Sequence, residues 1–240
     1  MSEAGPRGSI VVFAKVPEAG RVKTRLCPPF APEQAADFYA AMLDDILEAT
    51  ECFARGLGLE PVVALDPGTA CREWARQAPP GYRVIPQVGA SLSERMERAV
   101  EVEAARGQGV VLLRGSDSPA LPQARVAQAL DALESHDIAV APDRDGGYSL
   151  IGMTRPWPGL FAHPMSTDSV LADTLAQAEG LGARSAVLKP SFDIDRFSDL
   201  SSLSALRALP EAILCPRTFA YLDGQELWPD SGGVRGPGGP

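Results

Sequence analysis

Short apolar runs and longer amphipathic segments alternate along most of the chain. The apolar runs are rich in β-branched residues and lie at residues 10–13, 62–65, 110–113 and 138–141. Runs of this length without strict apolar–polar alternation are typical of strands buried on both faces of a sheet. The pattern therefore predicts four strands in the core of one sheet.

The segments between the runs carry apolar residues at the spacing of an amphipathic helix. In residues 32–55 an apolar stripe recurs with the helical period, as expected of one buried helix face. We predict further helices at residues 91–105, 123–133, 167–179 and 199–206. Ser91 and Glu94 have the spacing of a capping box, which predicts a helix start at this point.

The alternation of strands and helices favours parallel strand pairing, because each helix carries the chain back along the sheet. We therefore expect a Rossmann-like α/β fold with a mostly parallel central sheet and helices on both faces. One domain is predicted at residues 9–223, between a flexible start at 1–8 and a disordered Gly/Pro-rich tail at 224–240. Ligands bind such sheets beyond the carboxyl ends of the strands, so functional residues are expected directly after the apolar runs.

The net charge argues against one broad class of function. The 240 residues carry 22 basic and 31 acidic side chains, a formal net charge of −9. A general nucleic-acid-binding protein needs a basic face that replaces counterions on phosphates, so we expect no nucleic-acid partner. No apolar run reaches the ~20 residues of a membrane helix, and the polar start lacks the apolar core of a signal peptide. We expect a cytoplasmic protein without membrane insertion.

A dense group of cations follows the first apolar run. Four basic residues lie within residues 15–25, in a loop that also holds a glycine and a threonine. The residues that we assign to phosphate binding here are Lys15, Gly20, Arg21, Lys23, Thr24 and Arg25. Basic side chains give charge-assisted hydrogen bonds to phosphate oxygens, and glycine permits close backbone approach. Val22 stands where a Walker A loop has glycine, so this is a different kind of loop, and a solvated basic loop is the alternative.

Aspartates follow the third run and recur near residue 194. Asp117, next to Ser116, is placed to meet a hard cation such as Mg²⁺ or, alternatively, to cap the next helix. Asp193 and Asp195 are two positions apart, so on an extended segment both lie on one face. Two oxygens on one face can hold a divalent cation, and a pair of helix N-caps is the alternative.

An Asp-Gly-Gly-Tyr segment at residues 145–148 follows the fourth run. Between two apolar strands, such a segment is typical of a hairpin turn. In the functional interpretation, the two glycines let the backbone approach a ligand while the aspartate and the tyrosine bind its hydroxyl groups. The residues assigned to acceptor binding are Asp145, Gly146, Gly147, Tyr148, Ser166 and Thr167.

Taken together, these segments resemble a known bacterial family. The motifs are F-A-K-x-P-x-x-G-R-V-K-T-R-L at 13–26, G-S-D-S-P-x-L-P at 115–122, D-G-G-Y-x-L-I-G at 145–152, M-S-T at 165–167 and D-I-D at 193–195. They are similar to the GT-A-type glycosyltransferases associated with arsenosugar biosynthesis, within the nucleotide-diphospho-sugar transferase superfamily. A more distant similarity is to the guanylyltransferases of cofactor synthesis.

The resemblance implies a GT-A fold with a nucleotide half and an acceptor half. It implies that the four cations of residues 15–25 surround the nucleotide phosphates and that the loop at 145–148 lies at the acceptor. Asp117 takes the place of the family's metal-binding aspartate, and Asp193 or Asp195 supplies the second carboxylate. Residues 116–118 differ from the D-x-D motif of many glycosyltransferases, because they hold a single carboxylate.

The leading hypothesis is a glycosyltransferase that moves a sugar from a nucleotide sugar to a small-molecule acceptor, with Mg²⁺ or Mn²⁺ as cofactor. The alternative is a nucleotidyltransferase that joins a nucleoside triphosphate to a phosphorylated acceptor and releases pyrophosphate. A non-catalytic nucleotide-binding protein is the third hypothesis, and the three candidate metal aspartates count against it. For catalysis we assign Asp117, Lys23 and Asp145, the last as the group that positions or deprotonates the acceptor hydroxyl.

Overall fold

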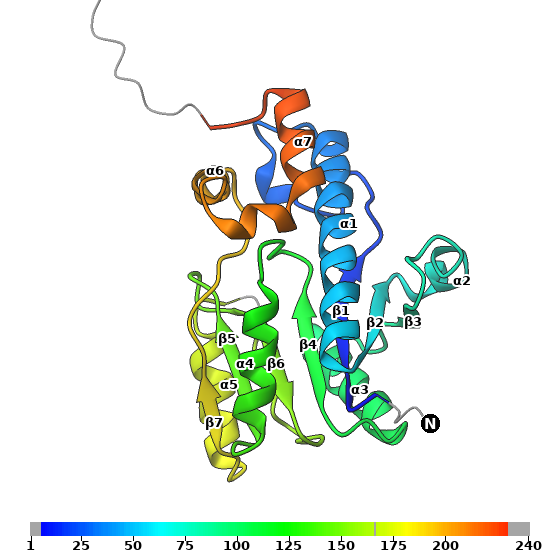
Figure 1. The fold of residues 1–240 in the computed structure, drawn as a ribbon, viewed down its shortest axis with the longest axis vertical. Helices are drawn as coiled ribbons and strands as arrows, with labels where there is room; N and C mark the ends of the chain where they lie inside the picture. The colour runs from blue at the N-terminus through cyan, green and yellow to red at the C-terminus, as the bar shows by residue number, and fades with distance from the viewer. Residues whose placement is uncertain (1–5, 166, 230–240) are drawn as a thin grey trace, which may run out of the picture.

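A single seven-stranded sheet forms the centre of the protein, in a computed structural model that describes residues 6–165 and 167–229 (Figure 1). The strands are β1 (Gly8–Lys15), β2 (Leu59–Asp66), β3 (Arg83–Pro86), β4 (Val111–Gly115), β5 (Ile138–Pro142), β6 (Tyr148–Met153) and β7 (Ser185–Val187). Their order is β3-β2-β1-β4-β6-β5-β7, and β6 alone runs antiparallel to its neighbours β4 and β5. The predicted α/β fold with a mostly parallel sheet is confirmed.

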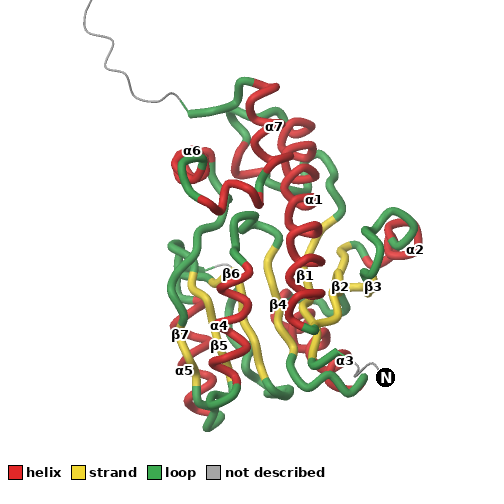
Figure 2. The backbone as a smooth tube through the Cα atoms, viewed as in Figure 1, coloured by secondary structure: helices red, strands yellow, loops and turns green. Residues whose placement is uncertain are grey.

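Helices cover both faces of the sheet (Figure 2). They are α1 (Pro32–Leu57), α2 (Cys71–Trp74), α3 (Leu92–Ala105), α4 (Gln123–Leu133), α5 (Val170–Gly180), α6 (Leu200–Leu206) and α7 (Pro216–Gln225). On one face α1 and α4 pack against alternate strand residues such as Ile10 and Leu112. On the other face α3 and α5 pack against the intervening ones, such as Val11 and Leu113. Because these strands are buried on both faces, their sequences are continuous apolar runs.

A third apolar cluster lies beyond the carboxyl ends of the strands, where α6 and α7 pack against the first turns of α1. Ile194 is fully buried in this cluster together with Leu203 and Leu222. We call α6, α7 and the chain between them the C-terminal cap. It places the segment around Ile194 next to the sheet edge at which ligands bind in folds of this kind.

The predicted elements correspond closely to those observed. All four predicted strands are present, and the helix at 123–133 begins and ends where expected. The predicted capping box is confirmed in part, since the Ser91 hydroxyl accepts a hydrogen bond from the Glu94 amide at 3.2 Å. The helix expected from residue 167 begins at Val170, and the last one expected begins at Leu200 after a short 3₁₀ turn. No helix among the described residues is long and apolar enough to cross a membrane.

Two predicted boundaries are wrong. The expected tail from residue 224 starts too early, because α7 continues to Gln225 and Trp228 packs against the cap and donates to Asp223 at 2.7 Å. The expected flexible start at 1–8 is too long, since β1 begins at Gly8 and the Arg7 amide donates to the Gly58 carbonyl at 2.9 Å. The Gly/Pro-rich composition gives no indication that Trp228, which precedes that segment, packs against the fold. Residues 1–5 and 230–240 lie outside the described structure.

Candidate functional site

Lys23 joins three segments that are far apart in the sequence. It lies between β1 and α1 and has a left-handed backbone conformation with φ +48°. Its ammonium donates to the Asp117 carboxylate and to the carbonyl oxygen of Ile194. The Lys23 side chain is 3% exposed, whereas that of Asp117 is 53% exposed. We call residues 15–25 the cation loop. This loop and both predicted aspartate segments, at Asp117 and at residues 193–195, therefore meet beyond the ends of β1 and β4.

The other three cations of the loop are more exposed. Arg25 forms an ion pair with Asp195, and Arg21 forms one with Glu18 at 2.8 Å. Lys15 is the exposed last residue of β1. Two of the four predicted phosphate-binding cations, Lys23 and Arg25, are therefore engaged with the predicted aspartates, and the other two are exposed.

The smaller residues predicted at the phosphate site differ in their surroundings. Gly20 has φ +75°, and the space where a Cβ would point is open, which fits the predicted close approach of a ligand to the backbone. Thr24 is exposed. Ser116 is 6% exposed, and its hydroxyl lies 2.8 Å from the hydroxyl of Tyr39, so it contacts helix α1.

Three carboxylates gather opposite the cation loop. Asp143 and Asp145 belong to the β5–β6 hairpin, Asp193 follows β7, and one oxygen of each lies within 4.8 Å of the others. Burial, reinforced by the charges of Asp193 and Asp145, raises the pKa of Asp143 to about 8. Burial and the Asp145 charge raise the pKa of Asp193 to about 6. Both shifts come first from burial and then from neighbouring carboxylates, which make the ionised forms of Asp143 and Asp193 unfavourable.

The trio has the chemistry of a site for a hard divalent cation. Mg²⁺ and Mn²⁺ prefer carboxylate oxygens. One carboxylate oxygen of Asp143, Oδ1, is buried and has no hydrogen-bond partner among the described residues. A cation would satisfy this oxygen and relieve the mutual repulsion of the three groups. The donor set therefore fits the divalent cation that the sequence motifs suggested.

The cluster differs from the predicted metal set of Asp117, Asp193 and Asp195. Only Asp193 joins the cluster, because Lys23 and Arg25 take up the other two carboxylates. The sequence shows carboxylate spacing but not which cations face the carboxylates after folding. Asp143 was missed, although it lies two residues before Asp145 on the same hairpin.

The Asp-Gly-Gly segment is a hairpin turn, as one of the two interpretations predicted. The Asp143 amide donates to the Gly147 carbonyl, and the Gly147 amide donates to the Asp145 carboxylate, both at 3.0 Å. Gly146 has φ +89°, and its carbonyl accepts from the Leu171 amide at 2.8 Å. The turn is thereby docked on the start of α5, and Asp145 is held at its tip.

The predicted acceptor residues are only partly brought together. Asp145 lines a cavity, whereas Tyr148 packs against the core on the α3 and α5 face. Burial raises the pKa of Tyr148 to about 12, and its hydroxyl has no hydrogen-bond partner in the described part of the chain. Thr167 bonds locally to Ser169 at 3.1 Å. Ser166 lies outside the described residues.

A cavity of about 270 Å³ lies between the hairpin tip and the C-terminal cap. It borders the acidic cluster through Asp145 and Asp193 and the cation loop through Arg25. Its walls are formed by Arg25, Arg144, Asp145, Asp168, Phe192, Asp193, Asp195, Arg196, Asp199 and Ser202. A concave, polar space next to clustered charges is a candidate binding site for a small molecule.

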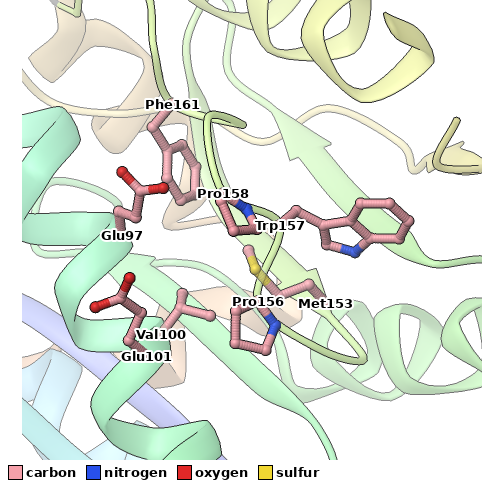
Figure 3. A pocket seen from close by; sticks show the side chains of 8 residues that line it. All are labelled: Glu97, Val100, Glu101, Met153, Pro156, Trp157, Pro158 and Phe161. Carbon is pink, nitrogen blue, oxygen red and sulfur yellow. The ribbon is translucent and has the colours of Figure 1, made fainter. Parts of the chain in front are cut away.

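A second, much smaller cavity lies between α3 and the loop after β6 (Figure 3). Its volume of about 10 Å³ is close to the space that one water molecule requires. Glu97, on its wall, accepts from the Gly159 amide at 2.8 Å. The cavity is thus part of the packing between α3 and this loop rather than a substrate site.

The family model of an "Uncharacterized protein conserved in bacteria (DUF2064)" matches residues 50–167. The chain is 29% identical to a candidate nucleotide-diphospho-sugar transferase from Desulfovibrio desulfuricans G20, whose crystal structure superposes with a TM-score of 0.77. That match covers 91% of this chain and 98% of the other.

Two further proteins are similar to this chain, one in sequence and one in fold. The "Phosphoenolpyruvate guanylyltransferase" of Sphaerobacter thermophilus is 25% identical over 197 residues, which cover 81% of this chain and 92% of that protein. A 4-diphosphocytidyl-2C-methyl-D-erythritol synthase is similar in fold alone, with a TM-score of 0.56, 14% identity, and coverage of 85% and 100%. The resemblance to nucleotide-diphospho-sugar transferases is confirmed, and the comparisons support a nucleotidyl or glycosyl transferase.

Proposed function

We propose that this protein is a glycosyltransferase that depends on a divalent cation. It transfers a sugar from a nucleoside-diphosphate sugar to a hydroxyl group of a small acceptor. The observation that carries the choice of glycosyl transfer is the charge of the cavity beside the cation loop. Its walls hold five aspartates against three arginines, and Asp143 lies behind them. Even with a divalent cation bound, these six aspartates outnumber the five positive charges of the arginines and the cation. An acceptor with a doubly charged phosphate would therefore meet an excess of like charge there, whereas a neutral hydroxyl compound would not.

The donor's diphosphate is assigned to the cation loop. Lys15 and Arg21 are exposed, Arg25 forms an ion pair with Asp195 at the cavity wall, and the nearly buried Lys23 forms one with Asp117. These side chains would bind the diphosphate and stabilise the charge that develops as it leaves. A divalent cation held by Asp143 and Asp193, with Asp145 beside it, would offset the same charge as a Lewis acid.

Asp145 is assigned to the acceptor. It lies at the cavity wall, fixed by the Gly147 amide. In the reaction the acceptor oxygen bonds to the anomeric carbon, the bond from that carbon to the diphosphate breaks, and the acceptor proton passes to a carboxylate. Asp145 is the carboxylate placed to accept it.

Nucleotidyl transfer is the second candidate, favoured by the relative named as a guanylyltransferase. In that reaction an acceptor phosphate attacks the α-phosphate of a nucleoside triphosphate, and pyrophosphate leaves. The density of four cations between residues 15 and 25 suits a triphosphate as well as a diphosphate.

A product assay separates the two candidates. Purified protein is first screened by thermal shift against nucleotides and nucleotide sugars with and without Mg²⁺ or Mn²⁺, since a ligand of the native state raises stability. The donor found in this way is then incubated with candidate acceptors. Release of a nucleoside diphosphate without pyrophosphate is the expected result. Pyrophosphate release that depends on a phosphorylated acceptor would reject glycosyl transfer.

A further inference from the structure

Helix α1 reaches the site through the hydroxyl group of one buried residue. Tyr39 is 3% exposed, and its ring packs among apolar side chains between α1 and the sheet. The backbone amide of Lys15, at the end of β1, donates to the Tyr39 hydroxyl at 3.0 Å. The same hydroxyl lies 2.8 Å from the hydroxyl of Ser116, at the end of β4. One oxygen thus connects the first residue of the cation loop to the turn that carries Asp117.

The connection continues to the acidic cluster. The carbonyl oxygen of Asp117 accepts from the Ile194 amide at 2.9 Å, and Ile194 directly follows Asp193. A continuous series of contacts therefore runs from the Lys15 backbone through Tyr39 and Ser116 to the segment that holds one carboxylate of the cluster. Phosphate groups and a cation would bind at opposite ends of this series.

We propose that Tyr39 is a positioning residue that couples phosphate binding at the cation loop to cation binding at the aspartate cluster. This inference rests on the proposed function, because it takes phosphate and a divalent cation as the ligands of these two places. The ring alone is sufficient for packing, since its neighbours Val12, Ala14 and Leu43 are apolar. The hydroxyl is the part that contacts both loops, so its removal breaks this one connection without leaving a large cavity, while the bonds of Lys23 to Asp117 and to the Ile194 carbonyl remain.

The test uses Tyr39→Phe, with inorganic pyrophosphate as the phosphate probe. Calorimetry gives the dissociation constant of pyrophosphate with and without Mg²⁺, and the ratio of the two constants measures the coupling. Tyr221→Phe is the matched control. Its hydroxyl likewise makes a hydrogen bond to a distant segment, donating from α7 to the Gln34 carbonyl of α1 at 2.9 Å.

We expect Mg²⁺ to tighten pyrophosphate binding to the wild type and to the Tyr221→Phe protein by the same factor. In Tyr39→Phe that factor should fall at least fivefold, while the affinity without Mg²⁺ changes less than threefold. A coupling ratio in Tyr39→Phe equal to that of the wild type would overturn the inference and leave the proposed function intact. A wild type that does not bind pyrophosphate at all would overturn both. Thermal unfolding of each variant without ligand shows whether any loss follows from the fold alone.

Discussion

Asp143 is the residue whose charge conflicts most strongly with its surroundings. Its pKa of about 8 lies above the usual value for an aspartate because of burial and two neighbouring carboxylates. The native state therefore binds more protons than the unfolded state between the usual pKa and about 8. Since stability falls as the pH rises wherever the native state holds the extra proton, the raised pKa of Asp143 lowers the stability of the fold progressively between the usual pKa of an aspartate and about 8. Such conflicts are more typical of binding sites than of structural positions.

Replacement of Asp143 by Asn should stabilise the ligand-free protein at pH 8. Asn keeps the size of the side chain and removes the ionisation, so the melting temperature should exceed that of the wild type at pH 8. The difference should shrink as the pH falls to 5, where wild-type Asp143 is protonated. Mg²⁺ should raise the melting temperature of the wild type more than that of Asp143→Asn. Thermal unfolding between pH 5 and pH 8.5 measures each of these effects.

The control for this series is Asp131→Asn, an exposed aspartate on α4. It removes the same formal charge from the molecule at a distance from the cluster. If the melting temperatures of both variants change with pH in the same way, the effect comes from net charge. An unfavourable ionisation of Asp143 in the native state would then be rejected.

Lys23 and Arg25 should differ in how much they contribute to the stability of the fold. Lys23→Met leaves the Ile194 carbonyl without its buried donor, which typically costs about 1–3 kcal/mol of stability. Arg25→Met breaks an ion pair whose arginine is 56% exposed, so the loss should be at most about 1 kcal/mol. Both should weaken pyrophosphate binding, by about 1.5–3 kcal/mol for a direct charge-assisted bond. Urea unfolding and calorimetry separate the two quantities, and a folded double variant with wild-type affinity would refute the assignment.

At this scale the sequence indicated candidate residues but not their partners after folding. Lys23 and Asp117 are 94 positions apart, and Lys23 and Ile194 are 171 apart, so no local pattern indicates that they meet. Tyr148 shows the opposite error. Its place beside the glycines suggested a ligand-binding hydroxyl, but tertiary packing directs the side chain into the core.

The hairpin between β5 and β6 is the element that brings the acidic groups to the cavity. Gly146, at its tip, has φ +89°, and a Cβ there would come within 2.0 Å of the Asp168 carbonyl oxygen. Side chains other than hydrogen are therefore excluded both by conformation and by contact. The close contact with Asp168 fixes the position of the tip relative to α5.

Gly146→Ala should consequently be far more destabilising than an alanine at a comparable glycine. Gly159 provides the control, because it has φ +87° but open space where the Cβ would point. Gly159→Ala should cost about 1–2 kcal/mol for the left-handed conformation alone. Gly146→Ala adds the displacement of the backbone at Asp168, for which overpacking costs of about 1–3 kcal/mol are typical. Equal free energies of unfolding in urea would show that the hairpin tip is not tightly docked.

The elements themselves were predictable where burial is complete. Strands β1, β2, β4 and β5 and helix α1 carry continuous or periodic apolar patterns, and these were found from the sequence alone. The central strand β6 was expected only as the second strand of the hairpin interpretation. The edge strands β3 and β7 were missed, because neither holds a fully buried residue and so neither carries a core pattern. Helix α7 was also missed, since its contacts with α1 join residues more than 160 positions apart.

At the scale of the whole molecule, the C-terminal cap and the site share one cluster of buried residues. Ile194 is fully buried in that cluster, while its neighbours Asp193 and Asp195 line the cavity. The cap is fastened to α1 through Asp45, which is 2% exposed. Its carboxylate accepts from the Thr218 amide and hydroxyl, each at 2.8 Å, and from the Arg217 amide at 3.1 Å. A weaker attachment of the cap to α1 should therefore increase the mobility of the segment that holds Asp193 and Asp195.

Thr218→Val tests this connection. It removes one hydrogen bond to Asp45 and keeps the backbone bond, so the protein should still fold, with a loss of about 1–3 kcal/mol. Hydrogen exchange should accelerate in residues 192–196 more than in β1 and β2, because the cap opens without unfolding of the sheet. The Ile194 amide is the most direct reporter, since it is protected by its bond to the Asp117 carbonyl.

Thr174→Val is the matched control for this last prediction. Thr174 is 1% exposed, and its hydroxyl donates to the Val170 carbonyl at 2.7 Å within α5. It removes this bond and the contact of the same hydroxyl with His163 at 2.9 Å, both on the other side of the sheet. It should lower global stability without a selective effect on residues 192–196. If both variants raise exchange at Ile194 only in proportion to their loss of global stability, the cap and the sheet open as one unit. The site would then owe its geometry to the whole fold, and a local role of the cap in placing Asp193 would be rejected.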